Sequence, residues 1–302
     1  MRLAIFSDVH ANPAALDAFL SDIKERQVDA CWSLGDMFGR GWNPNATARL
    51  LRRLYNKQKP RHRQAWLLGN HDLMVLGHIP IVVFGPVGGA GGHDPMAERI
   101  AGQHHEWLLQ NSPECYEWAR ETVGEGRRKS HHAWGHGVYL AHAAYRYDGK
   151  NQVDETASYS AYLNHRQEDA PRDIARCLEN LQTCAPEQPR LMLGGHSHVK
   201  GLWAWQQGQE HAQRLSDSGG NFELGQQTVF YLNPGSLGFP RDEACPSYAL
   251  LEVDKNWQQM TIEFVSVRYN GAGVPEDDFP SDYPPQLRES IRRCRSNEGG
   301  TP

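Results

Sequence analysis

The sequence predicts an α/β fold, and two observations support this prediction. Over the first 72 residues, short apolar runs alternate with amphipathic segments in the order strand, helix, strand, helix, strand. In addition, five apolar runs along the chain end directly in acidic, amide or histidine side chains. Because ligand-type residues at the carboxyl ends of strands meet in one crevice of an α/β sheet, these positions also predict a functional site.

Local signals define the first elements in chain order. The run over residues 3–6 is short, apolar and bounded by polar residues, as expected for a buried strand. Asn12 and Pro13 then provide an N-cap acceptor and a proline at the first helical position. Apolar residues from Leu16 to Ile23 continue with helical spacing. A strand over 30–34, a helix with Leu50, Leu51 and Leu54 inward, and a strand over 65–68 are predicted to follow.

The middle and end of the chain are less regular. Residues 77–95 are rich in glycine and proline, which predicts a loop. Later elements are predicted as helices over 96–121 and 173–183, and as strands over 138–141, 191–193, 228–232, 248–253 and 260–267. We assign residues 1–268 to one domain with an insertion over about 77–135, and residues 269–302 to a C-terminal tail with a short helix near 285–294.

The composition excludes several classes of protein. The 31 Lys and Arg residues against 36 Asp and Glu give a net charge of −5, which disfavours long nucleic acids as partners. No run approaches the roughly 20 apolar residues of a membrane helix. An acid at position 8 interrupts the apolar stretch that a signal peptide would need. We therefore expect a cytoplasmic protein with its six cysteines reduced.

The side chains that follow the apolar runs have the chemistry of metal ligands. They are Asp8, His10, Asp36, Asn70, His71, His142, His196 and His198. Nitrogen and oxygen donors together suit Mn, Fe, Zn, Co or Ni better than Mg or Ca. A single such pair is common by chance, but five clusters behind five apolar runs are not. They predict two cations with Asp36 as the bridging carboxylate, and a pair of cations serves in-line displacement at phosphorus.

The motifs resemble those of a known superfamily. The order Asp8-x-His10, Gly35-Asp36, Gly69-Asn70-His71-Asp72, His142 and Gly195-His196-Ser197-His198 resembles the calcineurin-like metallophosphoesterases. Residues 35–45 and the sequence Asn233-Pro234-Gly235-Ser236-Leu237-Gly238 resemble its bacterial branch of small predicted phosphodiesterases. The resemblance spans about residues 1–268. It implies a four-layer α/β/β/α sandwich with two mixed sheets, and a dinuclear metal site at the carboxyl ends of the strands.

The resemblance also implies a role for each position. One metal would be held by Asp8, His10, Asp36 and His198, and the other by Asp36, Asn70, His142 and His196. Two divalent transition-metal ions are implied, with manganese favoured. Hydroxide bridging them would attack phosphorus in line. His71 would act beside the leaving oxygen, as a general acid or by stabilising charge, and either Asp72 or Asp36 would orient it.

Two departures bear on the substrate. Gly39 stands where phosphoprotein phosphatases of the superfamily carry the second acid of Gly-Asp-x-x-Asp-Arg-Gly, which disfavours that activity. Arg40 is retained, and we predict that it grips phosphate, with Asn70 as a second substrate contact. A small phosphodiester or nucleotide is therefore the expected substrate. A phosphomonoesterase or phosphoprotein phosphatase is the alternative, and a non-catalytic metal-binding scaffold is a further one.

Other histidines and aromatic residues are expected to have no role in chemistry. His104 and His105 lie on a polar helix and are expected to be solvated. Trp203 and Trp205 follow a ligand-bearing loop, where packing is a simpler interpretation than stacking on a base.

Overall fold

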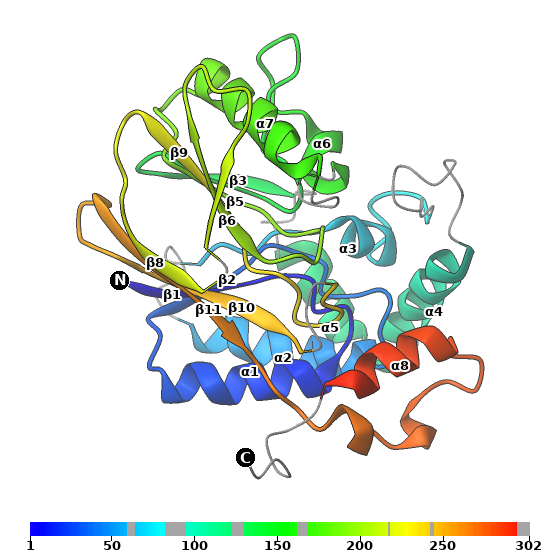
Figure 1. Ribbon diagram of the computed structural model, residues 1–302. Helices are drawn as coiled ribbons and strands as arrows, with labels where there is room; N and C mark the ends of the chain where they lie inside the picture. Colours follow the sequence, from blue (N-terminus) through cyan, green and yellow to red (C-terminus); the bar gives the residue numbers. More distant parts are fainter. Residues whose placement is uncertain are drawn as a thin grey trace.

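Two β-sheets pack face to face, and helices cover the outer face of each (Figure 1). The computed structural model describes residues 1–58, 64–81, 95–122, 130–161, 163, 168–216, 218–241 and 245–294. Within these ranges the predicted four-layer α/β/β/α sandwich is confirmed. Among the described helices, none combines the length and apolar character that crossing a membrane requires.

The first sheet has five strands and is mixed. Its order is β2 (Ala30–Ser33), β1 (Arg2–Phe6), β10 (Ser247–Val253), β11 (Gln259–Ser266) and β8 (Gly219–Glu223). Strands β1 and β2 are parallel, with Ile5 opposite Trp32, and the other pairs are antiparallel. The parallel pair brings the residues after Phe6 and those after Ser33 to the same edge of the sheet.

The second sheet has six strands and is also mixed. Its order is β3 (His131–Gly135), β4 (Val138–Ala141), β5 (Leu191–Leu193), β9 (Thr228–Asn233), β6 (Gly201–Gln206) and β7 (Gln213–Ser216). Strands β4, β5 and β9 are parallel to one another. The loops after β4 and β5 therefore leave the sheet at one edge.

The first helix begins at the predicted Pro13, and further helices cover both sheets. Helices α1 (Pro13–Glu25) and α2 (Pro44–Lys57) lie on the first sheet, and α6 (Glu155–Ser160) and α7 (Ala170–Cys184) lie beside the second (Figure 1). The side chain of Asn12 accepts a hydrogen bond from the Ala15 amide at the start of α1, as an N-cap does. Asn43 caps α2 in the same way.

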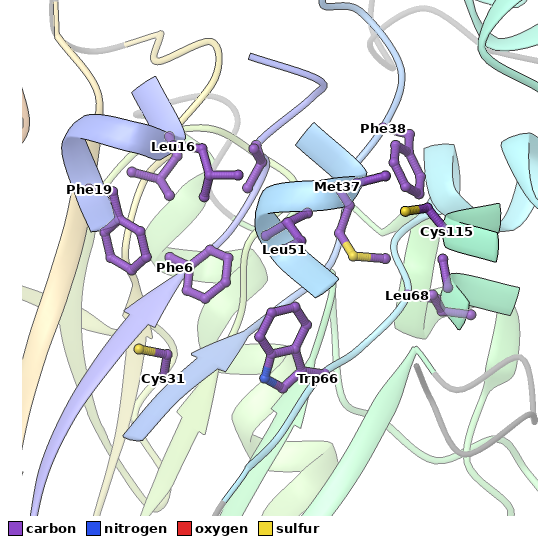
Figure 2. Packing of buried hydrophobic residues seen from close by; sticks show 14 of the residues in the cluster. Phe6, Leu16, Phe19, Cys31, Met37, Phe38, Leu51, Trp66, Leu68 and Cys115 are labelled. Atoms are coloured by element: carbon purple, nitrogen blue, oxygen red, sulfur yellow. The ribbon is translucent and has the colours of Figure 1, made fainter. Parts of the chain in front are cut away.

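The alternation of side chains along the strands builds separate cores. In β1, Leu3 and Ile5 face the second sheet and belong to the core between the sheets. Ala4 and Phe6 face the other way, toward α1 and α2. Figure 2 shows this outer core, in which the ring of Phe6 lies near Phe19 with ring centroids 4.9 Å apart. The core between the sheets therefore fixes how the loops that follow the strands of one sheet face those of the other.

Two predicted elements differ in the structure. The predicted strand over 65–68 is reduced to one bridge between Trp66 and Ser33, because the chain enters α3 (Asn70–Val75) directly afterwards. The predicted helix over 96–121 is split into α4 (Pro95–Asn111), α5 (Pro113–Glu117) and a π-helical turn (Trp118–Thr122). The break falls at Pro113, which lacks the amide needed to continue the helix. Residues 82–94 and 123–129 of the predicted insertion lie outside the described residues.

The described residues after β11 pack on the sandwich. This C-terminal segment, residues 269–294, includes short 3₁₀ turns over Gly271–Gly273 and Glu276–Asp278 and the predicted helix, α8 (Pro285–Arg293). In Figure 1, α8 lies beside α4, and Ile100 of α4 belongs to the same buried cluster as Ile291 of α8. Buried side chains of the segment form one cluster with Trp42 and Phe239. They are Tyr269, Phe279, Tyr283 and Ile291.

Candidate metal centre

Loops from both sheets bring the predicted ligands together. Asp8 and His10 follow β1, Asp36 follows β2, Asn70 opens α3, His142 follows β4, and His196 and His198 follow β5. All except Asn70, which is half-buried, are buried. The potential ligand atoms form three groups, and within each group all atoms lie within 4.8 Å of one another. The groups are Asp8, His10 and His198; His10, Asp36 and His71; and Asp36, His142 and His196.

The first group forms a compact triangle. Oδ1 of Asp8 lies 3.3 Å from Nε2 of His198 and 3.8 Å from Nε2 of His10, and the two Nε2 atoms are 3.0 Å apart. A cation bound at about 2.0–2.2 Å brings its ligand atoms to roughly this spacing.

The second group surrounds Nε2 of His142. This nitrogen lies 3.4 Å from Oδ2 of Asp36, 3.2 Å from Oδ1 of Asn70 and 3.2 Å from Nδ1 of His196. The same Oδ2 of Asp36 is 3.6 Å from Nε2 of His10. One oxygen of Asp36 therefore faces both groups, as a bridging ligand would.

Main-chain contacts aim these side chains at the centre. The Nδ1 of three rings faces a carbonyl oxygen: Phe38 for His10 at 2.9 Å, Leu34 for His142 at 2.8 Å and Phe239 for His198 at 2.6 Å. An Nδ1–H donated to a carbonyl leaves Nε2 as the lone-pair donor, which is the tautomer that binds a metal. The histidine donors thus fit a cation.

The two carboxylates are held in a similar way. Oδ2 of Asp8 accepts a hydrogen bond from the His196 amide at 3.0 Å, and Oδ1 of Asp36 accepts one from the His71 amide at 2.9 Å. Each carboxylate keeps its second oxygen for the centre.

The electrostatics of the cluster favour carboxylate anions. Burial raises the pKa of Asp36, but His142 and His71 outweigh this effect and hold the pKa well below its ordinary value. The pKa of Asp8 is also lowered, because His198 outweighs the effect of burial. Burial lowers the pKa of His10 and His196 well below the usual range, so both stay neutral ligands near pH 7.

The ligand loops have an unusual backbone conformation. Five of the predicted ligands adopt a positive φ between 47° and 64°: Asp8, His10, Asp36, His196 and His198. Non-glycine residues rarely adopt this left-handed conformation, which persists where the surrounding structure enforces it and clusters at functional sites.

His71 lies beside the predicted ligands. Of its two predicted carboxylate partners, Asp36 accepts from the amide of His71, whereas Asp72 is engaged by other amides. Its ring meets that of His10 edge-on at a centroid distance of 4.9 Å. The carboxylate of Asp72 accepts hydrogen bonds from the amides of Phe38 and Gly69, both at 3.0 Å. Nδ1 of His71 is buried and has no hydrogen-bond partner among the described residues. Burial lowers the pKa of His71 to about 4, so the ring is neutral at pH 7.

The structure also brings the two predicted substrate contacts to the centre. The positive charge of Arg40 helps to lower the pKa of His10, His71 and His198, and the preceding Gly39 packs against the ring of His71. Its Nε is buried and makes no hydrogen bond with any described residue. Asn70 lies at the second group through its contact with His142.

Two buried side chains near Arg40 were missed by sequence reasoning. His104 is not solvated: its exposure is 0%, and both of its ring nitrogens contact the backbone of the loop after β2. The signal was present, since His104 is four residues from both Ile100 and Leu108, on the buried face of α4. Tyr283 donates from its hydroxyl to the carbonyl of Arg40 at 2.6 Å, a long-range contact with no local sequence signal.

The predictions for the other histidine and tryptophans have different outcomes. His105 is half-buried, with Nδ1 2.8 Å from the carbonyl oxygen of Val75, so it is not fully solvated either. Trp203 and Trp205 are buried at 2% and 1% exposure, in the core of the second sheet under α7. Packing is confirmed as their role.

A four-layer sandwich with clustered carboxylate and histidine ligands at the carboxyl ends of its strands defines a metallophosphoesterase. Comparison with known proteins agrees. Residues 1–256 match the model of the calcineurin-like phosphoesterase superfamily domain, and the chain belongs to this superfamily. It is a metal-dependent phosphoesterase, and therefore a hydrolase.

Individual relatives are distant but similar in length. An uncharacterised protein of Methanocaldococcus jannaschii is 24% identical over 295 residues, which is 96% of each chain. The crystal structure of a metallophosphoesterase from Sphaerobacter thermophilus has a TM-score of 0.61 at 22% identity and covers 96% of this chain and 98% of its own. A hypothetical protein from Pyrococcus horikoshii has a TM-score of 0.59 at 12% identity, with coverage of 96% and 97%. These likenesses show the fold.

Proposed function

We propose that the chain is a phosphodiesterase that hydrolyses a small phosphodiester or nucleotide with the help of two divalent transition-metal ions. The observation that supports two ions is the position of Oδ2 of Asp36, 3.6 Å from Nε2 of His10 and 3.4 Å from Nε2 of His142. One ion would be held by Asp8, His10, Asp36 and His198, and the other by Asp36, Asn70, His142 and His196.

The chemistry of the donors supports first-row transition metals, and we favour manganese among Mn, Fe, Zn, Co and Ni. When bound, such a pair makes a water molecule a good nucleophile near neutral pH and offsets the charge of the phosphate. The protein supplies orientation, because main-chain carbonyls and amides fix the ligand side chains before any substrate arrives.

The remaining residues of the site would act on the substrate. His71 is neutral at pH 7, since burial lowers its pKa to about 4. We therefore assign it to donating a hydrogen bond to the leaving oxygen, which stabilises the charge that develops there. Arg40, whose buried Nε has no described partner, would grip a non-bridging phosphate oxygen, and Asn70 would provide a second contact.

The position of Gly39 supports a diester over a phosphoprotein. A Cβ at this residue would collide with Nδ1 of His71, so the second acid of the phosphoprotein phosphatase motif has no room here. The retained Arg40 favours a second candidate function, hydrolysis of phosphomonoesters, because a guanidinium pairs well with a dianionic phosphate.

The test is kcat/KM on bis-p-nitrophenyl phosphate and on p-nitrophenyl phosphate after loading with Mn²⁺. We expect a clear preference for the diester, and loss of both activities in Asp36→Asn. A clear preference for the monoester would contradict the phosphodiesterase and support the second candidate. Two bound ions without turnover of either compound would instead support a metal-binding scaffold.

A further inference from the structure

The residues Gly39, Arg40 and Gly41 form a very tight turn beside the metal centre. The amide of Gly41 donates to the carbonyl oxygen of Gly39 at 2.6 Å, two residues back. Gly39 and Arg40 have φ values of 80° and 53°. Such a three-residue turn with positive φ is strained, and it persists only where neighbouring groups enforce it.

His104 holds this turn from α4. The amide of Gly39 donates to Nδ1 of His104 at 3.0 Å, and Nε2 of His104 lies 3.1 Å from the carbonyl oxygen of Gly41. Because Nδ1 accepts a hydrogen bond, the ring proton is on Nε2, which donates to Gly41. One fully buried imidazole thus satisfies a backbone group on each side of Arg40.

Tyr283 holds the same turn from the C-terminal segment. Its hydroxyl donates to the carbonyl oxygen of Arg40 at 2.6 Å, and its side chain is 4% exposed. The two holding elements are themselves joined, because Arg99 and Gln103 of α4 donate to the side chain of Asp282 at 2.8 and 3.1 Å. Position 283 lies beyond the residues that match the superfamily model.

The turn also packs directly on the site, which couples its position to the catalytic groups. A Cβ on Gly39 would collide with the ring of His71, and a Cβ on Gly41 would collide with the carbonyl oxygen of His10. Movement of the turn would therefore move the Arg40 side chain relative to these two histidines.

We propose that His104 and Tyr283 are positioning residues that fix the backbone of Arg40 and thereby hold its guanidinium ready for a phosphate group. This inference rests on the proposed role of Arg40 as a phosphate contact. It gives the helix α4 and the C-terminal segment a function in substrate binding, although neither supplies a metal ligand.

The first test compares two Tyr→Phe variants in the Mn²⁺-loaded enzyme. Tyr283→Phe removes only the hydroxyl that contacts Arg40. We expect the KM for bis-p-nitrophenyl phosphate to rise about tenfold, with kcat within about twofold of the wild type. Tyr139→Phe is the matched control, because that buried hydroxyl also donates to a carbonyl, Glu187 at 2.9 Å, but in the second sheet. It should leave KM unchanged. Equal KM values for Tyr283→Phe and the wild type would contradict the proposal.

His104 offers a graded version of the same test. His104→Phe keeps a ring but removes both polar contacts, so KM should rise at least as much as in Tyr283→Phe. His104→Gln retains an amide that can donate to Gly41, and we expect it to restore part of the loss. A KM for His104→Gln as high as that of His104→Phe would argue for a purely structural role.

The decisive experiment is a double-mutant cycle on the affinity for inorganic phosphate, measured by calorimetry. Tyr283→Phe should weaken binding in the wild type but have no further effect in Arg40→Ala, because the hydroxyl acts through Arg40. Independent, additive losses would overturn the positioning role. If Arg40→Ala alone leaves the affinity unchanged, the proposed role of Arg40 is wrong. If Arg40→Ala weakens binding and Tyr283→Phe does not, only this inference is wrong.

Discussion

Nε2 of His10 and Nε2 of His198 lie 3.0 Å apart, while the Nδ1 atoms of the same rings face the carbonyl oxygens of Phe38 and Phe239. In neutral rings that donate from Nδ1, both Nε2 atoms are acceptors, and no proton is left to join them. Two lone pairs at this distance repel each other, and a cation bound by both removes the repulsion. The fold therefore holds the two Nε2 atoms in positions that favour binding of a metal ion between them.

Removal of metal should consequently destabilise the folded protein as well as inactivate it. We expect about two ions per chain by elemental analysis, and dialysis against a chelator should lower the unfolding temperature. At a free metal concentration near 100 times Kd, the stabilisation from one ion is about 2.7 kcal/mol. Re-addition of Mn²⁺ should restore both properties. If the chelator removes the ions and the unfolding temperature does not change, this prediction is wrong.

Asp36→Asn tests the shared ligand. The substitution keeps an oxygen for the amide of His71, now 2.9 Å from Oδ1, but replaces the oxygen that faces both groups of ligands. We expect activity to be abolished and the metal content to fall toward one ion or none. Asp148→Asn is the control, since this exposed aspartate also accepts amide hydrogen bonds, from Lys150 and Gln152. Full activity in Asp36→Asn would rule out a shared carboxylate.

The sequence was sufficient to predict which side chains cluster, because each one follows a strand or opens a helix, where local patterns are strongest. The apolar run before Asp8 or His142 predicts the strand that each residue follows, and the packing of the strands then brings such residues together. The contacts of Tyr283 and His104 were not predictable in this way. They join residues 243 and 65 positions apart, so only the packing of α4 and the C-terminal segment reveals them. The strand expected at 65–68 failed for a related reason, since pairing with Ser33 is limited to one bridge by the turn into α3.

His71→Ala tests the role at the leaving oxygen. The ring nitrogen is not required for either proposed metal set, so both ions should remain bound. We expect a loss of about 10²–10⁴-fold in kcat on a dinucleotide, whose alkoxide leaving group needs stabilisation. The loss should be smaller on bis-p-nitrophenyl phosphate, because p-nitrophenolate is stable without help. Equal losses on both substrates would argue against this role.

Gly39→Ala tests whether the ring of His71 tolerates any side chain beside it. Gly39 has a φ of 80°, and an added Cβ would collide with Nδ1 of His71. A displacement of the ring by about 1 Å is enough to cost roughly 10²-fold in rate. Gly208→Ala is the matched control, since Gly208 has a similar φ of 87° but no heavy atom within 4 Å of the added Cβ. Both variants should lose about 1 kcal/mol of stability from the backbone, but only Gly39→Ala should lose activity. A fully active Gly39→Ala would show that the ring has room to move.

The buried His104 should make the folded protein sensitive to mild acid. Burial lowers its folded-state pKa to about 3, whereas the unfolded chain binds a proton near pH 6.5. The unfolded state therefore takes up more protons between pH 6.5 and 3, so the stability from this group is present above pH 6.5 and is lost as the pH falls through that window. By pH 5 the loss amounts to about 2 kcal/mol for one histidine. This loss of stability can be measured by urea unfolding of the chelator-treated protein at pH 7.5 and 5.0. His104→Gln should lose correspondingly less stability between these pH values than the wild type. The other buried histidines are common to both proteins and cancel in the difference. Equal acid losses in the two proteins would mean that the pKa of His104 is not depressed in the folded state.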